Sequence, residues 1–355
     1  MTRSSRRDFL RGKVSAAAPE PAPAAGPQSY TIQIGRRAMA CEFEVILNAG
    51  QYPDGTQAAL AALNIVEALE DQMSVFRSRS EISRLNLLAA EAPVAVEPGL
   101  FELLRLAVDV HHETEGAYDI TASPLWRTWG FARREGAIPA EADLAGALEQ
   151  VGSRWLELDA EARTVRFLKS GLEVNLGSIG KGYALDRAGD HLEAAGVSDF
   201  LFHAGSSSIL ARGSRLDGAP AGPNGEPAGW SVGVPHPLRP TLRLAELRLR
   251  NRALGTSSSA AQFFRYRGRR YGHILDPRTG WPAEKTLSAT VLAPSGAQAD
   301  ALSTAFFVMG HEAALHYCET HPEIAALLVV PVAGGRGFEV HSAGLAEGEL
   351  EMLAD

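Results

Sequence analysis

The stretch SATVLAPSGAQADALSTAFFVMG, residues 288–310, passes directly from the pattern of a β-strand to that of an α-helix. We expect the strand to end at the Pro-Ser-Gly turn, and one long helix to continue from there to Thr320. Every fold class that combines strands and helices contains such a unit, so the rest of the chain must decide the class.

Strands and helices are interleaved along the remaining chain without a regular alternation. Amphipathic helices are predicted over residues 56–76, 98–116 and 181–196, and strands or hairpins over 30–47, 154–176, 324–332 and 337–344. This order favours an α+β fold with mixed β-sheets flanked by helices over a doubly wound parallel sheet. Because we find no repeat and no linker, residues 30–355 are expected to form a single domain.

The first 29 residues differ in composition from the rest. SSRRDFLRG contains the twin-arginine pair of bacterial export signals. The following residues lack the apolar run that a signal peptide needs, because Lys13, Glu20 and three prolines interrupt it. We interpret residues 1–29 as a disordered tail, with an export signal as the alternative, so the location is either cytoplasmic or periplasmic.

Composition excludes two classes of partner. The formal net charge of −8 is unlike the basic surface of a nucleic-acid-binding protein. No segment is long and apolar enough to predict a transmembrane helix. A phosphate-bearing ligand would therefore need a local positive charge or a metal ion. The only two cysteines, Cys41 and Cys318, are interpreted as packed thiols.

The stretch VNLGSIGKGYALD, residues 174–186, predicts a buried strand, a turn with three glycines and the start of a helix. Glycines let a backbone approach a ligand closely, and a helix N-terminus favours anions. The spacing fits neither a Walker A loop nor a dinucleotide fingerprint. A phosphate-binding turn and an ordinary tight turn both remain open.

Asp300 and Thr304 lie four residues apart in the predicted helix, so their side chains share one face. Both offer hard oxygen ligands, which suit Mg²⁺ better than zinc. The alternative is that Asp300 only places a negative charge in the first turn of the helix.

Two further stretches combine groups that could act on a ligand. RYGHILDPRTGWP, residues 270–282, holds His273, Asp276 and Arg278 in a loop stiffened by prolines. TEGAYDITASPLWRTWGF, residues 114–131, is rich in aromatic side chains, which would suit a flat heteroaromatic ligand or an ordinary core.

Taken together and in this order, these stretches resemble the ApbE family of FAD:protein FMN transferases. The similarity extends from about Gly35 to Val340. Its landmarks are MACEFEV, MSVFRSRSEISRLN, GAYDITASPLWRTWGF, VNLGSIGKGYALD, ALGTSSS, HILDPRTGWP and SATVLAPSGAQADALSTAFFVMG.

The resemblance implies an ApbE-like fold with the ligand site in a central cleft. It also implies an Mg²⁺-dependent enzyme that cleaves the pyrophosphate of FAD, attaches FMN to a Thr or Ser hydroxyl of a partner flavoprotein and releases AMP. Acceptors in this family typically belong to electron-transfer complexes. FAD is thus expected as a substrate and Mg²⁺ as the cofactor.

Site residues follow from the same resemblance, position by position. The metal ligands would be the side chains of Asp300 and Thr304 and the backbone carbonyl of Gly180. Contacts with the flavin nucleotide would come from Met39, Phe76, Ala117, Tyr118, Asp119, Gly177, Tyr183 and Leu275.

The expected catalytic residues are His273, Lys181 and Asp276. A histidine with a reference pKa near 6.5 can take the proton of the acceptor hydroxyl. Lys181 would supply local positive charge, and Asp276 would orient His273, pair with Arg278 or brace the turn.

Three positions depart from the pattern of the family. Phe76 stands where Tyr is frequent, and Ser206 and Ser258 stand where Gly is frequent. The serines motivate one alternative, a protein that binds FAD without turning it over. A second alternative keeps the chemistry but uses water as the acceptor, which makes an FAD pyrophosphatase.

Overall fold

The computed structural model describes residues 30–216, 228–239, 241–260, 262–332 and 337–353. The interpretation of residues 1–29 as a disordered tail lies outside these described residues. Within them, no helix has the length and apolar character needed to cross a membrane.

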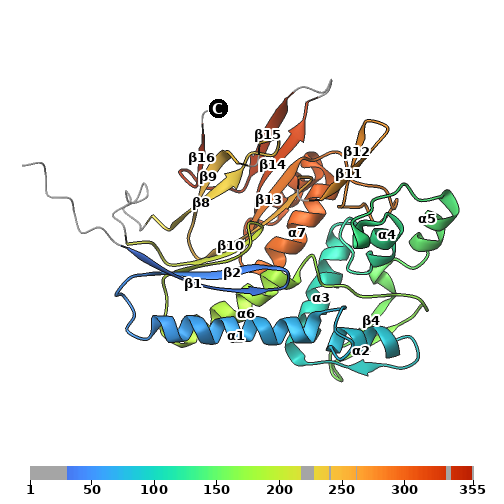
Figure 1. Cartoon of the computed structure of the whole chain (residues 1–355), viewed down its shortest axis with the longest axis horizontal. Helices are drawn as coiled ribbons and strands as arrows, with labels where there is room; N and C mark the ends of the chain where they lie inside the picture. Colours follow the sequence, from blue (N-terminus) through green and yellow to red (C-terminus); the bar gives the residue numbers. More distant parts are fainter. Residues whose placement is uncertain (1–29, 217–227, 240, 261, 333–336, 354–355) are drawn as a thin grey trace, which may run out of the picture.

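A large antiparallel sheet forms the centre of the molecule (Figure 1). Its eight described strands follow the order β1-β2-β6-β7-β10-β13-β14-β15. They span Thr31–Ala38, Cys41–Asn48, Phe200–Ala204, Ser208–Arg212, Arg252–Ser258, Ser288–Ala293, Ala325–Pro331 and Phe338–Ala343. The α+β class is therefore confirmed. Its sheets are antiparallel at every described pairing rather than mixed in direction, since the connections bring each strand back beside its neighbour.

Helices cover one face of this sheet and a small sheet covers the other. The helical face consists of α1 (Gly55–Met73), α6 (Gly180–Ala194), α7 (Gly296–Met309) and α8 (His311–Thr320). On the opposite face lies a three-stranded sheet of β16 (Leu350–Met352), β9 (Arg243–Leu249) and β8 (Trp230–Pro235). The expectation of one long helix over residues 297–320 is wrong, because Gly310 has φ of 88° and separates α7 from α8.

A second group of elements lies beside the helical layer (Figure 1). It contains α2 (Glu81–Leu88), α3 (Pro98–Glu113), α4 (Ser123–Thr128), a 3-10 turn (Phe131–Arg133), α5 (Glu141–Leu148), a second 3-10 turn (Ser153–Trp155) and a sheet of β3 (Val94–Ala95), β5 (Thr164–Phe167) and β4 (Leu156–Asp159). The hairpin of β11 (Phe263–Tyr266) and β12 (Arg269–Gly272) packs its aromatic side chains against Trp129 and Phe131.

The buried strand expected at the start of residues 174–186 is not formed. Residues 172–176 belong to no strand, and the side chain of Asn86 bonds to the backbone of Val174 instead of a neighbouring strand. The Asn86 amide donates to the Val174 carbonyl at 2.9 Å, and its oxygen accepts from the Val174 N–H at 2.8 Å. One side chain thus satisfies the backbone groups that a strand partner would satisfy.

Two glycine contacts bring α7 close to its neighbours. A Cβ on Gly182 would lie 1.9 Å from the carbonyl oxygen of Gly296, and one on Gly255 would lie 2.4 Å from that of Ala299. Both contacts are to backbone atoms, which cannot rotate away. Helix α7 therefore packs so closely against α6 and β10 that only glycine fits at positions 182 and 255.

Candidate active site

A cavity of about 520 Å³ opens where β10, α6, α7 and two loops meet. Its walls include residues from the loop before α4, the N-terminal turn of α6, the end of β10, the loop after β12 and one face of α7. The expected central site is thus formed by segments that are far apart in the sequence. Of the predicted residues, the cavity is lined by Phe76, Ala117, Tyr118, Asp119, Gly177, Lys181, His273, Leu275, Asp300 and Thr304.

Asp300 is a buried carboxylate at the base of this cavity, with 5% of its surface exposed. It accepts a hydrogen bond from the Ser208 hydroxyl at 2.7 Å and another from the Gly182 N–H at 2.8 Å. Burial raises the pKa of Asp300, while the charge of Lys181 and these two hydrogen bonds oppose the rise. Among the described residues, Asp300 forms no salt bridge within 4 Å, and the charge of Lys181 acts on it from a longer distance.

Hydroxyl groups surround the same part of the cavity. The Ser257 hydroxyl lies 3.0 Å from that of Ser303 and 3.2 Å from that of Thr304. The Thr304 hydroxyl also donates a long bond of 3.4 Å to the Asp300 carbonyl. Within the described chain, no cluster of three or more His, Cys, Asp or Glu side chains forms a metal site.

This donor set fits Mg²⁺. The Asp300 carboxylate and the neighbouring hydroxyls of Ser257 and Thr304 are hard oxygen donors. Mg²⁺ uses few protein ligands because it keeps several waters. Gly180 is the first residue of α6, two positions before the amide that binds Asp300. Its carbonyl ligand role stays a prediction.

His273 follows β12 and presents its ring to the cavity. Its Nδ1 lies 3.0 Å from the Gln262 carbonyl oxygen, which can only accept, so Nδ1 carries the proton. Burial lowers the pKa of His273. Nε2 therefore keeps its lone pair near neutral pH and is the atom that can accept a proton from a ligand.

Asp276 does not line the cavity. Its two carboxylate oxygens accept from Nε and the terminal nitrogen of Arg278, each at 2.8 Å, and one also accepts from the Arg278 N–H at 3.0 Å. Among the alternatives left open by the sequence, this geometry favours pairing with Arg278 and bracing the turn. A catalytic role for Asp276 stays an untested prediction.

Two of the predicted nucleotide contacts also lie away from the cavity lining. Met39 occupies the β1–β2 turn with φ of 46°. The Tyr183 hydroxyl accepts from Arg187 at 3.0 Å, and Tyr183 faces the start of α3 near Gly99. Their contacts with a nucleotide remain predictions that this structure leaves untested.

The carboxylate of Asp119 points into the protein rather than to a ligand. It accepts hydrogen bonds from Thr121 and Ser153 at 2.6–2.9 Å. His111 Nδ1 lies 3.2 Å from it. Burial opposes ionisation of Asp119, but the hydrogen bonds and the neighbouring His111 hold the pKa of Asp119 below its usual range. In turn, Asp119 outweighs the effect of burial on His111 and raises the pKa of His111. Asp119 therefore shapes the wall through its backbone while its side chain anchors the loop.

The sequence did not single out several polar residues of the lining. They are Ser123, Asn175, Ser178, Ser207, Thr256, Ser257 and Ser303. The runs SSS at 206–208 and TSSS at 256–259 were the available signal, because clustered hydroxyls at the ends of strands are candidates for ligand binding. Ser206 is exposed in the β6–β7 turn outside the lining, whereas Ser258 lies in the lining.

Comparison with known proteins gives a consistent result. The family model described as ApbE matches residues 31–328. Proteins named FAD:protein FMN transferase from Vibrio cholerae and Haemophilus influenzae are 30% and 29% identical, and each alignment covers 76% of this chain and 78% of the relative.

Solved structures agree with this assignment. The flavin transferase ApbE from Vibrio cholerae superposes with a TM-score of 0.77 at 26% identity, covering 89% of this chain and 97% of the other. The ApbE protein from Thermotoga maritima gives a TM-score of 0.75 at 26% identity, covering 87% and 96%. With its sequence and its fold both matching, the chain belongs to the ApbE family.

Proposed function

We propose that this protein is an Mg²⁺-dependent FAD:protein FMN transferase that attaches FMN to a Ser or Thr hydroxyl of a partner flavoprotein and releases AMP. The observation that carries the proposal is one cavity lined both by a buried carboxylate that forms no salt bridge among the described residues, Asp300, and by a histidine with a free lone pair, His273. The names of its relatives support the same reaction.

The residues divide the task between binding and proton transfer. Phe76 and the wall formed by Ala117 and Tyr118 provide surface for the flavin. Asp300 and Thr304 would hold Mg²⁺, and Lys181 adds positive charge beside the pyrophosphate. When bound, Mg²⁺ neutralises charge on the phosphates.

In the proposed reaction, the acceptor oxygen forms a bond to the phosphorus of the FMN half. The bond between that phosphorus and the bridging oxygen breaks, and AMP leaves with this oxygen. His273 Nε2 takes the proton of the acceptor hydroxyl. The lowered pKa keeps this nitrogen unprotonated at neutral pH, as a general base requires.

The test combines the protein with FAD, Mg²⁺ and a flavoprotein domain that carries a Ser or Thr acceptor. AMP together with flavin fluorescence on the acceptor after denaturing electrophoresis supports transfer. AMP with free FMN supports a pyrophosphatase instead. Tight FAD binding without either product, with a competent acceptor present, would rule out both reactions.

His273→Ala should slow transfer by about 10²–10⁴-fold, the usual contribution of a general base. FAD binding should change little, because the histidine acts on the acceptor. Single-turnover transfer and FAD titration by fluorescence separate the two effects. A transfer rate equal to that of the wild type would reduce His273 to a residue of loop structure.

The pH dependence of the wild type follows from the direction of the His273 shift. A base is active when unprotonated, and burial lowers its pKa below the usual value of about 6.5. Transfer should therefore stay level above that pH and fall only as the pH drops through the lowered pKa. The profile of kcat/KM against pH checks this, and a decline that begins above neutrality would contradict it.

Phe76 is 88% exposed although it lines the cavity, so a ligand can still cover its ring. We expect Phe76→Ala to weaken FAD binding by about 3–10-fold, as expected for one lost stacking contact. Phe76→Tyr should preserve the affinity. Leu87→Ala is the matched control, because Leu87 is 75% exposed on α2 and outside the cavity lining. Equal losses in both alanine variants would argue against stacking.

A further inference from the structure

The β11–β12 hairpin is strongly basic in an otherwise acidic chain. Residues 263–272 contain four arginines and no acidic residue, whereas the whole chain has a net charge of −8. Arg265, Arg267 and Arg269 are exposed. Arg269 is paired with Glu284 at 2.7 Å, but Arg265 and Arg270 have no salt bridge among the described residues.

Arg265 and Arg270 stand directly opposite each other on the two strands. Like charges at such positions repel one another. The Arg270 guanidinium lies 3.8 Å from the centre of the Phe263 ring, and its buried Nε has no hydrogen-bond partner in the described part of the chain. Burial and Arg265 lower the pKa of Arg270. An incoming carboxylate would relieve this repulsion.

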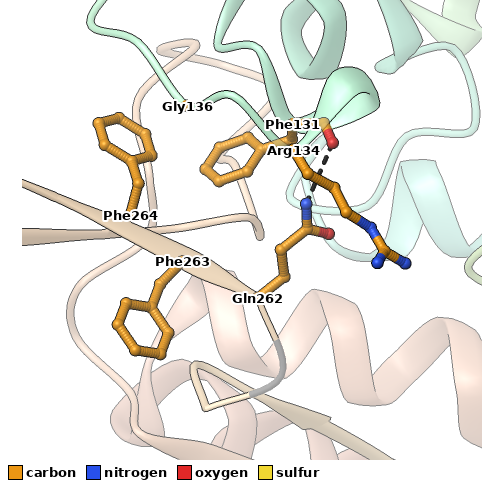
Figure 2. A pocket seen from close by; sticks show the side chains of 6 residues that line it. All are labelled: Phe131, Arg134, Gly136, Gln262, Phe263 and Phe264. Atoms are coloured by element: carbon orange, nitrogen blue, oxygen red, sulfur yellow. Dashed lines mark hydrogen bonds between the residues drawn. The ribbon is translucent and has the colours of Figure 1, made fainter.

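A second cavity of about 400 Å³ runs along β11 (Figure 2). We call it the β11 groove, and its lining residues are Phe131, Arg134, Gly136, Gln262, Phe263 and Phe264. Figure 2 shows the rings of Phe131 and Phe264 on one side of the strand and Phe263 on the other. Over the described residues, β11 pairs only with β12, so its other edge has no strand partner. Gly136 packs against the Phe264 ring, where an added Cβ would lie 2.5 Å from the ring.

The β11 groove leads to the active-site base. Gln262, at one end of the groove, donates from Nε2 to the Phe131 carbonyl at 3.0 Å. The backbone carbonyl of Gln262 accepts from the backbone N–H of His273 at 3.1 Å and from His273 Nδ1 at 3.0 Å. A chain lying along the groove would therefore pass beside His273.

We propose that the β11 groove binds an extended, acidic segment of the acceptor protein and delivers its Ser or Thr to His273. This inference rests on the proposed transfer reaction. The free edge of β11 would supply backbone hydrogen bonds, as in other cases of strand addition. Arg134, Arg265 and Arg270 would attract acidic side chains beside the acceptor residue.

Peptide binding tests the groove without requiring turnover. The probe is a fluorescein-labelled synthetic peptide with one central Thr flanked by Asp residues, and the matched probe has Asn in place of each Asp. With FAD and Mg²⁺ present, anisotropy should show the Asp peptide binding about 5–10-fold more tightly, as expected for a few exposed ion pairs. The preference should weaken as salt is added.

The double variant Arg134→Glu and Arg265→Glu should abolish this preference or reverse it. The double variant Arg163→Glu and Arg166→Glu is the control, because both residues are exposed in the β4–β5 hairpin and the total change of charge is the same. FAD affinity should stay within about twofold in all variants, since these side chains lie outside the nucleotide cavity. Equal binding of the two peptides to the wild type, or a preference retained by the double variant of Arg134 and Arg265, would overturn the proposal.

The same experiments separate a failure of the β11 groove proposal from a failure of the proposed transfer reaction. If the wild type prefers the Asp peptide but transfers no flavin to a competent acceptor, the proposed function fails and the groove stands. If flavin is transferred and the charge reversals change neither peptide binding nor KM for the acceptor, the reaction stands and the groove fails.

Discussion

Asp300→Asn should reduce Mg²⁺-dependent transfer by about 10³-fold or more, because the loss of a catalytic metal removes several kcal/mol of stabilisation. The substitution keeps the shape of the side chain but removes the carboxylate that the described part of the chain places beside Thr304 at the predicted metal site. An amide oxygen can still accept from Ser208 or from Gly182, so the fold should survive. Asp300→Ala should have the same effect on turnover.

Thermal unfolding separates loss of the site from loss of the fold. Burial disfavours the charged form of Asp300, so a neutral side chain should leave the Tm without metal unchanged or raise it. The wild type should gain stability from Mg²⁺ together with FAD, and Asp300→Asn should not. Asp199→Asn is a suitable control, because Asp199 is hydrogen-bonded but outside the cavity lining. Normal turnover in Asp300→Asn would remove the metal assignment.

Gly182→Ala should destabilise the protein by roughly 3 kcal/mol, at the upper end of the usual cost of overpacking. The new Cβ would lie 1.9 Å from the Gly296 carbonyl oxygen and 2.2 Å from its carbonyl carbon. Neither backbone atom can rotate away, so α6 and α7 must separate. This movement would also pull the Gly182 N–H away from Asp300.

Calorimetry should record a fall in Tm of roughly 4 °C for that loss of stability in a chain of this size. Gly146→Ala is the matched control. Gly146 lies in α5, and a Cβ there meets no atom within 4 Å. This control should stabilise the helix by up to about 1 kcal/mol. A Tm for Gly182→Ala equal to that of the wild type would show that the two helices can adjust at no cost.

Local patterns predicted a large part of the fold. The hairpin within residues 154–176 is confirmed as β4 and β5, and the helix that begins near residue 181 is confirmed as α6. These elements depend on neighbours in the sequence. The break at Gly310 is also local, because a glycine readily takes the positive φ that ends a helix, but hydrophobic periodicity does not show it. The replacement of a strand by Asn86 depends on a tertiary contact, which periodicity does not report either.

The same division applies to the site. The spacing of Asp300 and Thr304 placed both in the lining, because a helix fixes which residues share a face. The partners of Asp300 could not be foreseen, since Ser208 and Gly182 come from distant segments. For Asp119, the resemblance implied a nucleotide contact, and only the positions of His111 and Ser153 show that its carboxylate is bound inside the protein.

The order of strands in the large sheet has a consequence for synthesis on the ribosome. From β1 to β15, the order across the sheet is the order along the chain. Each newly synthesised strand can therefore pair with a neighbour that has already been synthesised. No strand has to be inserted later between two strands that are already in place. Because α7 follows β13, a nascent chain can assemble six of these strands before it contains Asp300.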